Sequence, residues 1–282
     1  MDAGRPTEKL RLAAVQMCSS QDPEQNVARA VRRIREAAEA GADVVALPEN
    51  FAFMGGDRDR AQAAQDLGGE VFGALRAASR GLGVILQAGS CLTPSTEDGD
   101  PRPRNTAVLL DRRGDVAAVY HKIHLFDVSP GDGIEYRESS YVRPGDRVVT
   151  AVLEGVGFGL SVCYDLRFPE LFRALALNGA RVTFVPSAFT WTTGKDHWLP
   201  LLRARAIENQ MYLVAPGQFG EHEDGRRTHG RSAIVDPWGT VLAQAPDREC
   251  VIYADYDAGY LEEVRSRIPV WNHRRPDVYG LG

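Results

Sequence analysis

Short apolar runs alternate with amphipathic segments over the first part of the chain. The runs at 10–17, 42–50 and 83–92 are short and end at glycine or polar residues, which predicts buried strands. Between the first two runs, apolar residues recur at helical spacing up to Gly41, and a second helical stretch covers 59–80. This alternation of strand and helix is typical of α/β layering.

The pattern changes in the middle of the chain. Apolar runs at 104–111 and 116–125 flank the turn sequence Arg-Arg-Gly-Asp, which predicts an antiparallel hairpin, and a loop at 126–147 follows. Helices are predicted at 169–180 and 197–210. Further strand-like runs lie at 148–153, 156–163, 181–189, 211–218, 231–236, 240–245 and 250–256. So many strands with so few long helices predict an α/β (α+β) fold of two mixed sheets covered by outer helices.

The chain of 282 residues has no low-complexity linker and no internal repeat, so we predict a single domain over 1–282. Its polar tail at 268–282 is not expected to be a core element. With 44% hydrophobic and 25% charged residues, the composition is that of an ordinary globular protein. A net charge of -5 at pH 7 gives no reason to expect nucleic acid or an anionic membrane as a partner, which favours a small-molecule substrate or another protein.

The N-terminal sequence lacks the charged-then-apolar layout of a signal peptide, and no apolar run approaches the ~20 residues needed to span a bilayer. The cytoplasm is therefore the expected location. Cys18, Cys91, Cys163 and Cys250 do not have the CxxC spacing of a metal site, and a reducing cytosol would keep them as thiols.

Cys163 ends an apolar run and is soon followed by a helix, whose first turn suits Pro169. A side chain on such a strand-to-helix turn is lifted towards a cleft, and helix N-terminal amides favour a thiolate, so Cys163 is a candidate nucleophile. The alternative is an inert core residue, because free cysteines are commonly buried. Ser161 is a poor fit as a nucleophile, since the Gly-x-Ser-x-Gly elbow of serine hydrolases needs glycine where Cys163 stands.

Three other charged residues could join this chemistry. Glu49 directly follows an apolar run, where partial desolvation would make its carboxylate a better proton acceptor; a surface position in a loop is the alternative. Lys122 could stabilise an oxyanion from within a cleft, although most lysines are solvated surface charges. Glu138, in the loop that follows, could balance the charge of Lys122 and hold it in place.

His121, His124 and Asp127 permit a rival interpretation of the lysine stretch as a metal site. Two histidines three residues apart share one face of a helix but lie on opposite faces of a strand. The apolar alternation in this stretch favours a strand, which argues against a shared metal ion.

Taken together, the segments "ALPEN", "HKIHLFD" and "SVCYDLRFPEL", in that order and with those separations, resemble the motifs of the nitrilase superfamily of carbon-nitrogen hydrolases. The resemblance covers nearly the whole chain. It implies a catalytic triad at Glu49, Lys122 and Cys163, with Glu138 as a second glutamate. It also implies a four-layer α-β-β-α sandwich, homodimers or larger homo-oligomers with the tail 268–282 at the interface, and no metal or organic cofactor.

Within the superfamily, residues 189–220 and the segments "DPWGTV" and "HRRPDVYG" are most similar to the deaminated glutathione amidases, with the omega-amidases next. Two positions depart from this pattern: Phe126, which is more like the omega-amidases, and Trp191, in a loop expected near the pocket. The resemblance implies hydrolysis of deaminated glutathione to 2-oxoglutarate and cysteinylglycine through a thioester. The alternatives are an omega-amidase acting on 2-oxoglutaramate or another small amide, and a non-catalytic interaction protein.

The implied reaction gives roles to two residues that follow the nucleophile in the sequence. The backbone N–H of Tyr164 would join Lys122 in holding the oxyanion. Arg167 is suited to bind a substrate carboxylate with two hydrogen bonds, and an ion pair with Asp165 or Glu170 is the alternative.

Phe189 and Thr193 match positions expected to line the pocket, with core packing as the alternative for Phe189. The possible leaving groups are ammonia and a cysteinylglycine dipeptide. We expect the loop at 189–197 and the basic stretch at 221–231 to set the choice between them.

Overall fold

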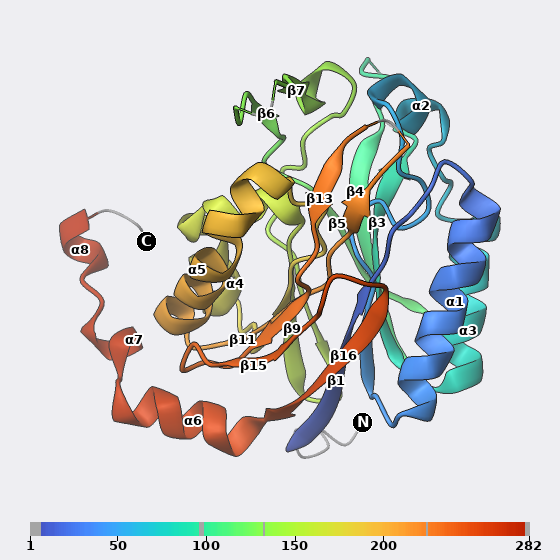
Figure 1. Cartoon of the computed structure of the whole chain (residues 1–282). Helices are drawn as coiled ribbons and strands as arrows, with labels where there is room; N and C mark the ends of the chain where they lie inside the picture. Colours follow the sequence, from blue (N-terminus) through green and yellow to red (C-terminus); the bar gives the residue numbers. More distant parts are fainter. Residues whose placement is uncertain (1–6, 96–98, 132, 224, 280–282) are drawn as a thin grey trace.

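The computed structural model describes residues 7–95, 99–131, 133–223 and 225–279. Within these ranges, two six-stranded sheets pack face to face and helices cover the outer side of each sheet (Figure 1). The predicted α-β-β-α sandwich of two mixed sheets is therefore confirmed.

The first sheet has the strand order β16-β1-β2-β3-β4-β5. These strands are β1 (Lys9–Gln16), β2 (Val44–Ala46), β3 (Ile85–Thr93), β4 (Arg104–Leu110), β5 (Val116–His121) and β16 (Cys250–Asp257). β1, β2 and β3 are parallel, whereas β4, β5 and β16 are antiparallel to the strands with which they pair. Helices α1 (Pro23–Glu39) and α3 (Glu70–Leu82) cover the outer face (Figure 1).

The second sheet has the order β15-β14-β11-β10-β9-β8. These strands are β8 (Thr150–Leu153), β9 (Val156–Leu160), β10 (Val182–Phe184), β11 (Tyr212–Ala215), β14 (Ala233–Val235) and β15 (Val241–Gln244). Helices α4 (Pro169–Leu177) and α5 (Trp191–Asn209) cover its outer face (Figure 1).

Smaller elements lie around this sandwich. They are the strand pairs β6 (Asp127–Val128) with β7 (Tyr136–Arg137) and β12 (Phe219–Glu221) with β13 (Arg227–His229), helix α2 (Asp57–Gln62), and two short 3-10 helices at Glu138–Ser140 and Cys163–Arg167. At the C-terminal end follow α6 (Ala258–Arg267), α7 (Val270–His273) and α8 (Pro276–Tyr279).

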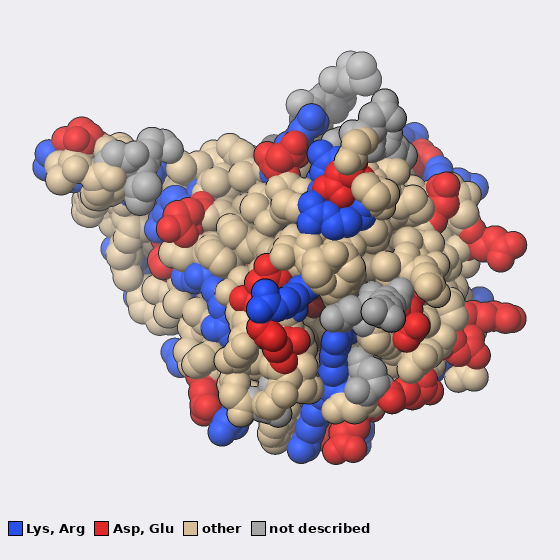
Figure 2. Space-filling view, turned by 90° about the horizontal axis from the view of Figure 1, so that it is seen from above, with Lys and Arg blue, Asp and Glu red and all other residues tan. Residues whose placement is uncertain are grey.

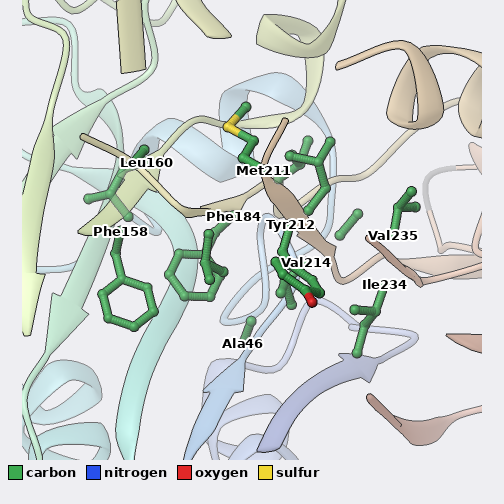
Figure 3. Close-up of a cluster of buried hydrophobic side chains, with 14 of the residues drawn as sticks. Ala46, Phe158, Leu160, Phe184, Met211, Tyr212, Val214, Ile234 and Val235 are labelled. Atoms are coloured by element: carbon green, nitrogen blue, oxygen red, sulfur yellow. The ribbon is translucent and has the colours of Figure 1, made fainter. Parts of the chain in front are cut away.

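Alternation along the strands of the first sheet divides the core in two. Leu12 and Ala14 of β1 belong to the cluster shared with the second sheet, whereas Ala13 and Val15 belong to the cluster under α1 and α3. Successive side chains of a strand point to opposite faces, so a strand covered on both sides is apolar throughout. Figure 3 shows the cluster between the sheets, where Ala46 of β2 lies near side chains of the second sheet.

The carboxyl ends of four strands position the candidate catalytic residues. The chain leaves the carboxyl ends of β2, β5, β9 and β10 through short connections to the segments that carry Glu49, Lys122, Cys163 and Ala188. Hydrogen bonds join these segments to one another, so they meet at one end of the sandwich.

Several predicted element bounds are wrong in detail. The stretch at 59–80 forms two helices, α2 and α3, and the helix predicted at 197–210 begins earlier, at Trp191. Trp191 therefore lies on a helix rather than in a loop. The loop at 126–147 contains β6, β7 and a 3-10 helix, and the tail contains α7 and α8. Within the described ranges, none of the helices combines the length and the apolar composition of a membrane-spanning segment.

Candidate functional site

Glu49 is held in place by the bulge in the neighbouring strand β3. Gly89 has a φ of +59°, and a Cβ there would lie 2.3 Å from the backbone oxygen of Pro48. Because glycine lacks a Cβ, β3 can lie close to the backbone of Pro48. The N–H of Ser90 donates to the same oxygen at 3.3 Å. Glu49 is consequently fixed just beyond the end of β2, with 3% of its surface exposed.

Lys122 lies between two carboxylates. Its Nζ is 3.2 Å from Oε1 of Glu49 and 2.8 Å from Oε2 of Glu138, and the lysine is 2% exposed. Glu138 begins a 3-10 helix and also accepts the backbone N–H of Phe126 at 2.7 Å. The structure therefore brings these three predicted residues into direct contact.

Cys163 begins a 3-10 helix between β9 and α4, as the predicted strand-to-helix turn requires. Its φ of +49° is in the left-handed region, which is uncommon for a residue with a Cβ. Its backbone N–H donates to Pro186 at 2.9 Å, and its thiol and the carboxylate of Glu49 interact closely enough to shift the pKa of each other. This turn directs the sulfur at the carboxylate of Glu49.

Asp165 fixes the geometry of this turn. Its Oδ2 accepts the N–H of Val162 at 2.8 Å and the hydroxyl of Tyr120 at 2.6 Å. Its Oδ1 lies 2.7 Å from Nδ1 of His124 and accepts the backbone N–H of the same residue at 3.1 Å. A fully buried carboxylate thus ties the Cys163 turn to the stretch that carries Lys122.

The charges of the site determine its resting protonation. Burial tends to raise the pKa of Glu49, but the charge of Lys122 and hydrogen bonds from Cys163 and Ala188 outweigh it, and the pKa is lowered. The pKa of Lys122 is well above its usual value despite burial, because Glu138 and Glu49 favour its charge. Burial and the charge of Glu49 raise the pKa of Cys163 well above its usual value. The resting site therefore holds a carboxylate, an ammonium and a thiol.

These residues lie in one pocket. Its described lining includes Glu49, Lys122, Glu138, Cys163 and Tyr164, together with Asn50, Met54, Arg60, Phe126, Tyr136, Arg137, Tyr141, Ala188, Phe189, Thr190, Thr193, Arg226, Arg227 and Thr228. Phe189 and Thr193 therefore line the pocket, as predicted. Phe189 is also a core residue, since its ring centroid lies 5.1 Å from that of Trp198.

Arg167 does not line this pocket. Its guanidinium lies over the rings of Tyr164 and Phe189, and its Nη1 is 3.2 Å from Nδ1 of His197. The alternative ion pair with Asp165 does not form among the described residues, because the oxygens of Asp165 bind other donors. Four other arginines reach the pocket instead: Arg60, Arg137, Arg226 and Arg227.

The rival metal site does not assemble. His121 contacts the hydroxyl of Thr106, while His124 binds Asp165 and stacks on Phe168 at a centroid distance of 3.6 Å. Asp127 accepts the backbone N–H of Ser139. In the described part of the chain, no group of three or more His, Cys, Asp or Glu side chains is arranged to hold a metal ion.

Two hydrogen-bond donors to the carboxylate of Glu49 are not among the residues predicted from the sequence. The side-chain amide of Asn105 donates to Oε1 of Glu49 at 2.9 Å, and the backbone N–H of Ala188 donates to Oε2 at 2.8 Å. Asn105 stands between Arg104 and Thr106, before the apolar part of β4, so the residue pattern gives no sign that it is buried beside Glu49. A backbone donor such as Ala188 leaves no signal in residue types.

The arrangement of Glu49, Lys122, Glu138 and Cys163 agrees with a comparison of the sequence with protein-family models. The model of the carbon-nitrogen hydrolase family matches residues 11–266, which include all four predicted catalytic positions. The chain belongs to the carbon-nitrogen hydrolase family. It is accordingly a hydrolase of carbon-nitrogen bonds other than peptide bonds.

Similar proteins place this carbon-nitrogen hydrolase in the nitrilase superfamily. A deaminated glutathione amidase from Synechocystis sp. is 42% identical over 265 residues, which cover 93% of this chain and 97% of that protein. The NitFhit protein of Caenorhabditis elegans superposes with a TM-score of 0.90 at 37% identity, over 98% of this chain and 68% of that chain. An amidase from Nesterenkonia sp. AN1 of the nitrilase superfamily, in a structure showing Michael addition of acrylamide at its active-site cysteine, superposes with a TM-score of 0.73 at 28% identity, over 92% of this chain and 98% of that chain.

Proposed function

We propose that this carbon-nitrogen hydrolase is a cysteine-dependent amidase in which Cys163 is the nucleophile, Glu49 the general base and Lys122 the oxyanion-stabilising cation. The observation that supports this most directly is the place of Glu49, whose carboxylate lies 3.2 Å from the ammonium of Lys122 and interacts with the thiol of Cys163. Glu138 keeps Lys122 charged and in position. This arrangement has the geometry of nucleophilic catalysis, with a nucleophile, an adjacent base and a fixed cation.

The first half of the reaction forms a thioester. Glu49 accepts the thiol proton while the sulfur of Cys163 attacks the amide carbon, and the carbonyl oxygen takes up the negative charge. Lys122 and the N–H of Tyr164 stabilise that oxygen. Tyr164 lies in the first turn of its 3-10 helix, and among the described residues its N–H has no acceptor. When the carbon-nitrogen bond breaks, Glu49 gives the proton to the departing amine.

The second half releases the acid. A water molecule attacks the thioester, and Glu49 accepts one of its protons as the carbon-oxygen bond forms. The sulfur of Cys163 leaves and regains a proton from Glu49, which restores the thiol and the carboxylate. One buried carboxylate acts in both halves, so no second base is needed.

The substrate that we propose is deaminated glutathione, hydrolysed to 2-oxoglutarate and cysteinylglycine. The similar protein from Synechocystis sp. carries this activity in its name. The second candidate is 2-oxoglutaramate, which has the same acyl group and loses ammonia; the resemblance of Phe126 to omega-amidases favours it. A ratio of kcat/KM values for the two substrates tests the choice, and a higher value for 2-oxoglutaramate would contradict the first proposal.

The chemistry has its own test. We expect Cys163→Ala to abolish turnover and the thioester adduct seen by mass spectrometry, with the thermal unfolding temperature retained. Iodoacetamide should inactivate the enzyme and EDTA should not. Retained activity of Cys163→Ala would contradict the nucleophile, EDTA inactivation would support the rival metal site, and absence of any adduct across a panel of amides would favour a non-catalytic interaction protein.

We further propose that the enzyme acts in the cytoplasm, without a metal or organic cofactor. The motif resemblance supports a homodimer or higher homo-oligomer whose interface includes the tail 268–282.

A further inference from the structure

The pocket that contains Cys163 has a basic wall, because the two acidic residues of its described lining already contact Lys122 and its four arginines remain. Its lining residues include the acids Glu49 and Glu138, and both contact Lys122. The four arginines of the lining come from α2, from β7 and from the β12–β13 hairpin with its connecting segment. Figure 2 looks down on the end of the molecule that carries these elements, where basic side chains lie among acidic ones. A pocket with this lining favours a substrate that carries negative charge.

Arg227 occupies a fixed place on this wall. Its Cζ lies 3.8 Å from the ring centroid of Trp191, the first residue of α5, so the guanidinium is stacked on an indole face. Stacking restrains the guanidinium plane but leaves its N–H edge able to bind a carboxylate with two hydrogen bonds. Arg227 is exposed and forms no ion pair with any residue that the structure describes.

The hairpin that carries Arg227 is attached to the pocket. The N–H of His229 donates to the backbone oxygen of Phe189 at 2.8 Å, and Thr228 bridges Thr190. A Cβ on Gly194 would lie 2.3 Å from the Cβ of His229, so α5 and β13 pack as closely as glycine allows. The backbone that carries Arg227 is therefore attached to the wall that carries Phe189.

A second arginine, Arg60, lies on the same pocket at the α2 side. Its Nε donates to Gly55 at 2.9 Å, and its Nη2 lies 3.3 Å from the sulfur of Met54. It is half-buried, and like Arg227 it forms no ion pair within the described ranges of the chain. The pocket thus presents two separately anchored cations, one more exposed than the other.

We infer that Arg227 binds the carboxylate of the departing amine and thereby sets the preference for amides whose two halves each carry a carboxylate. The inference rests on the proposed amidase reaction. The acyl half stays bonded to buried Cys163 after the amine has left, so the amine half must occupy the part of the pocket that opens to solvent. Arg227 is exposed there, whereas half-buried Arg60 suits the carboxylate of the acyl half. Deaminated glutathione has a carboxylate on each half, whereas 2-oxoglutaramate has only the carboxylate of the acyl half.

The test compares three substrates by their common product, 2-oxoglutarate. They are deaminated glutathione, its analogue with the glycine carboxylate replaced by a carboxamide, and 2-oxoglutaramate. We expect Arg227→Gln to lower kcat/KM for deaminated glutathione by about 10- to 100-fold, chiefly through KM, because a charge-assisted hydrogen-bond pair is lost. The other two substrates should change by less than about threefold. Arg227→Lys should restore part of the loss.

Arg231→Gln is the matched control, because Arg231 follows the same hairpin but does not belong to the described pocket lining, and its side chain is already paired with Asp247 at 2.7 Å. It should change all three substrates by less than about threefold. An equal loss for all three substrates in Arg227→Gln, or no loss for deaminated glutathione, would overturn the subsite while leaving the proposed reaction intact. No hydrolysis of deaminated glutathione by the unaltered enzyme would overturn the proposed substrate and the subsite together.

Discussion

Asn105 shows how one neutral side chain can tune a charged site. Its Nδ2 donates to Oε1 of Glu49 at 2.9 Å and lies 3.4 Å from Oε1 of Glu138, while its backbone oxygen accepts the N–H of Lys122 at 2.8 Å. Its buried Oδ1 has no hydrogen-bond partner among the described residues, so the two donor contacts set the amide orientation. Two carboxylates face one ammonium here, and Asn105 compensates part of the excess negative charge.

We therefore expect Asn105→Ala to raise the pKa of Glu49, because one donor to its carboxylate is lost. The acid limb of the kcat/KM profile should move up by about one pH unit, and kcat near neutral pH should fall about tenfold. Asn105→Asp, which is nearly isosteric and adds a like charge, should move the limb further in the same direction. If Asn105→Ala lowers the unfolding temperature but leaves the acid limb of the kcat/KM profile in place, Asn105 has only a structural role.

The pH dependence of the unaltered enzyme follows from the same pair of groups. Glu49 must be ionised to accept the thiol proton, and its pKa is lowered, so activity should persist as pH falls and be lost only below the ordinary glutamate value of 4.5. Cys163 has a raised pKa, so its alkylation by iodoacetamide should keep accelerating up to and beyond the ordinary cysteine value of 9.0. A plateau of the alkylation rate near pH 6 to 7 would instead indicate a resting thiolate.

At the scale of elements, the bulge of β3 links a backbone conformation to the position of the base. Gly89→Ala places a Cβ against the oxygen of Pro48, so the segment that carries Glu49 must shift. We expect kcat/KM to fall more than about 100-fold, since small displacements of catalytic groups are costly. Gly83→Ala is the control: Gly83 also has a positive φ, at the end of α3, but its Cβ would meet nothing within 4 Å.

The control should lose about 1 kcal/mol of unfolding free energy and keep its activity. Both variants should be followed by thermal unfolding and by kcat/KM. Equal activity of the two variants would show that the approach of β3 to Pro48 does not position Glu49.

Local patterns predict the elements that bring most of the site together. Glu49 follows an apolar run and Cys163 ends one, and the turn before Pro169 indicates where the thiol leaves the sheet. The pairing of β16 with β1 joins residues far apart in the chain, and no local pattern encodes it. Proximity to Cys163 in the sequence predicts a substrate-binding role for Arg167, whereas the packing of α5 against β13 places Arg227 in the described pocket lining.

At the scale of the whole molecule, the C-terminal tail leaves the compact sandwich. Helices α7 and α8 contain no buried side chain, and α8 stands off the body in Figures 1 and 2. Arg173 lies over the ring of Trp271 at 4.8 Å and connects α7 to α4. Apolar side chains of the tail face solvent in the single chain, with Ile268 at 47% and Val278 at 68% exposed. Burial of these side chains against a second copy would stabilise an oligomer.

Removal of residues 269–282 should therefore shift the protein to a smaller species in size-exclusion chromatography with light scattering. This truncation keeps Ile268, whose backbone oxygen accepts a hydrogen bond from Gln210 at 2.7 Å, so α6 retains its contact with the body. Val152→Asp is the control, because Val152 is an apolar residue of β8 that is 72% exposed, and its change should leave the mass unaltered. An unchanged mass on truncation would exclude the tail from the interface, and a monomeric full-length chain would contradict the homo-oligomer itself. Kinetics of the truncated form separate assembly from catalysis. Among the described residues, none beyond Thr228 lines the pocket, so kcat/KM should stay within about threefold if assembly only stabilises the fold.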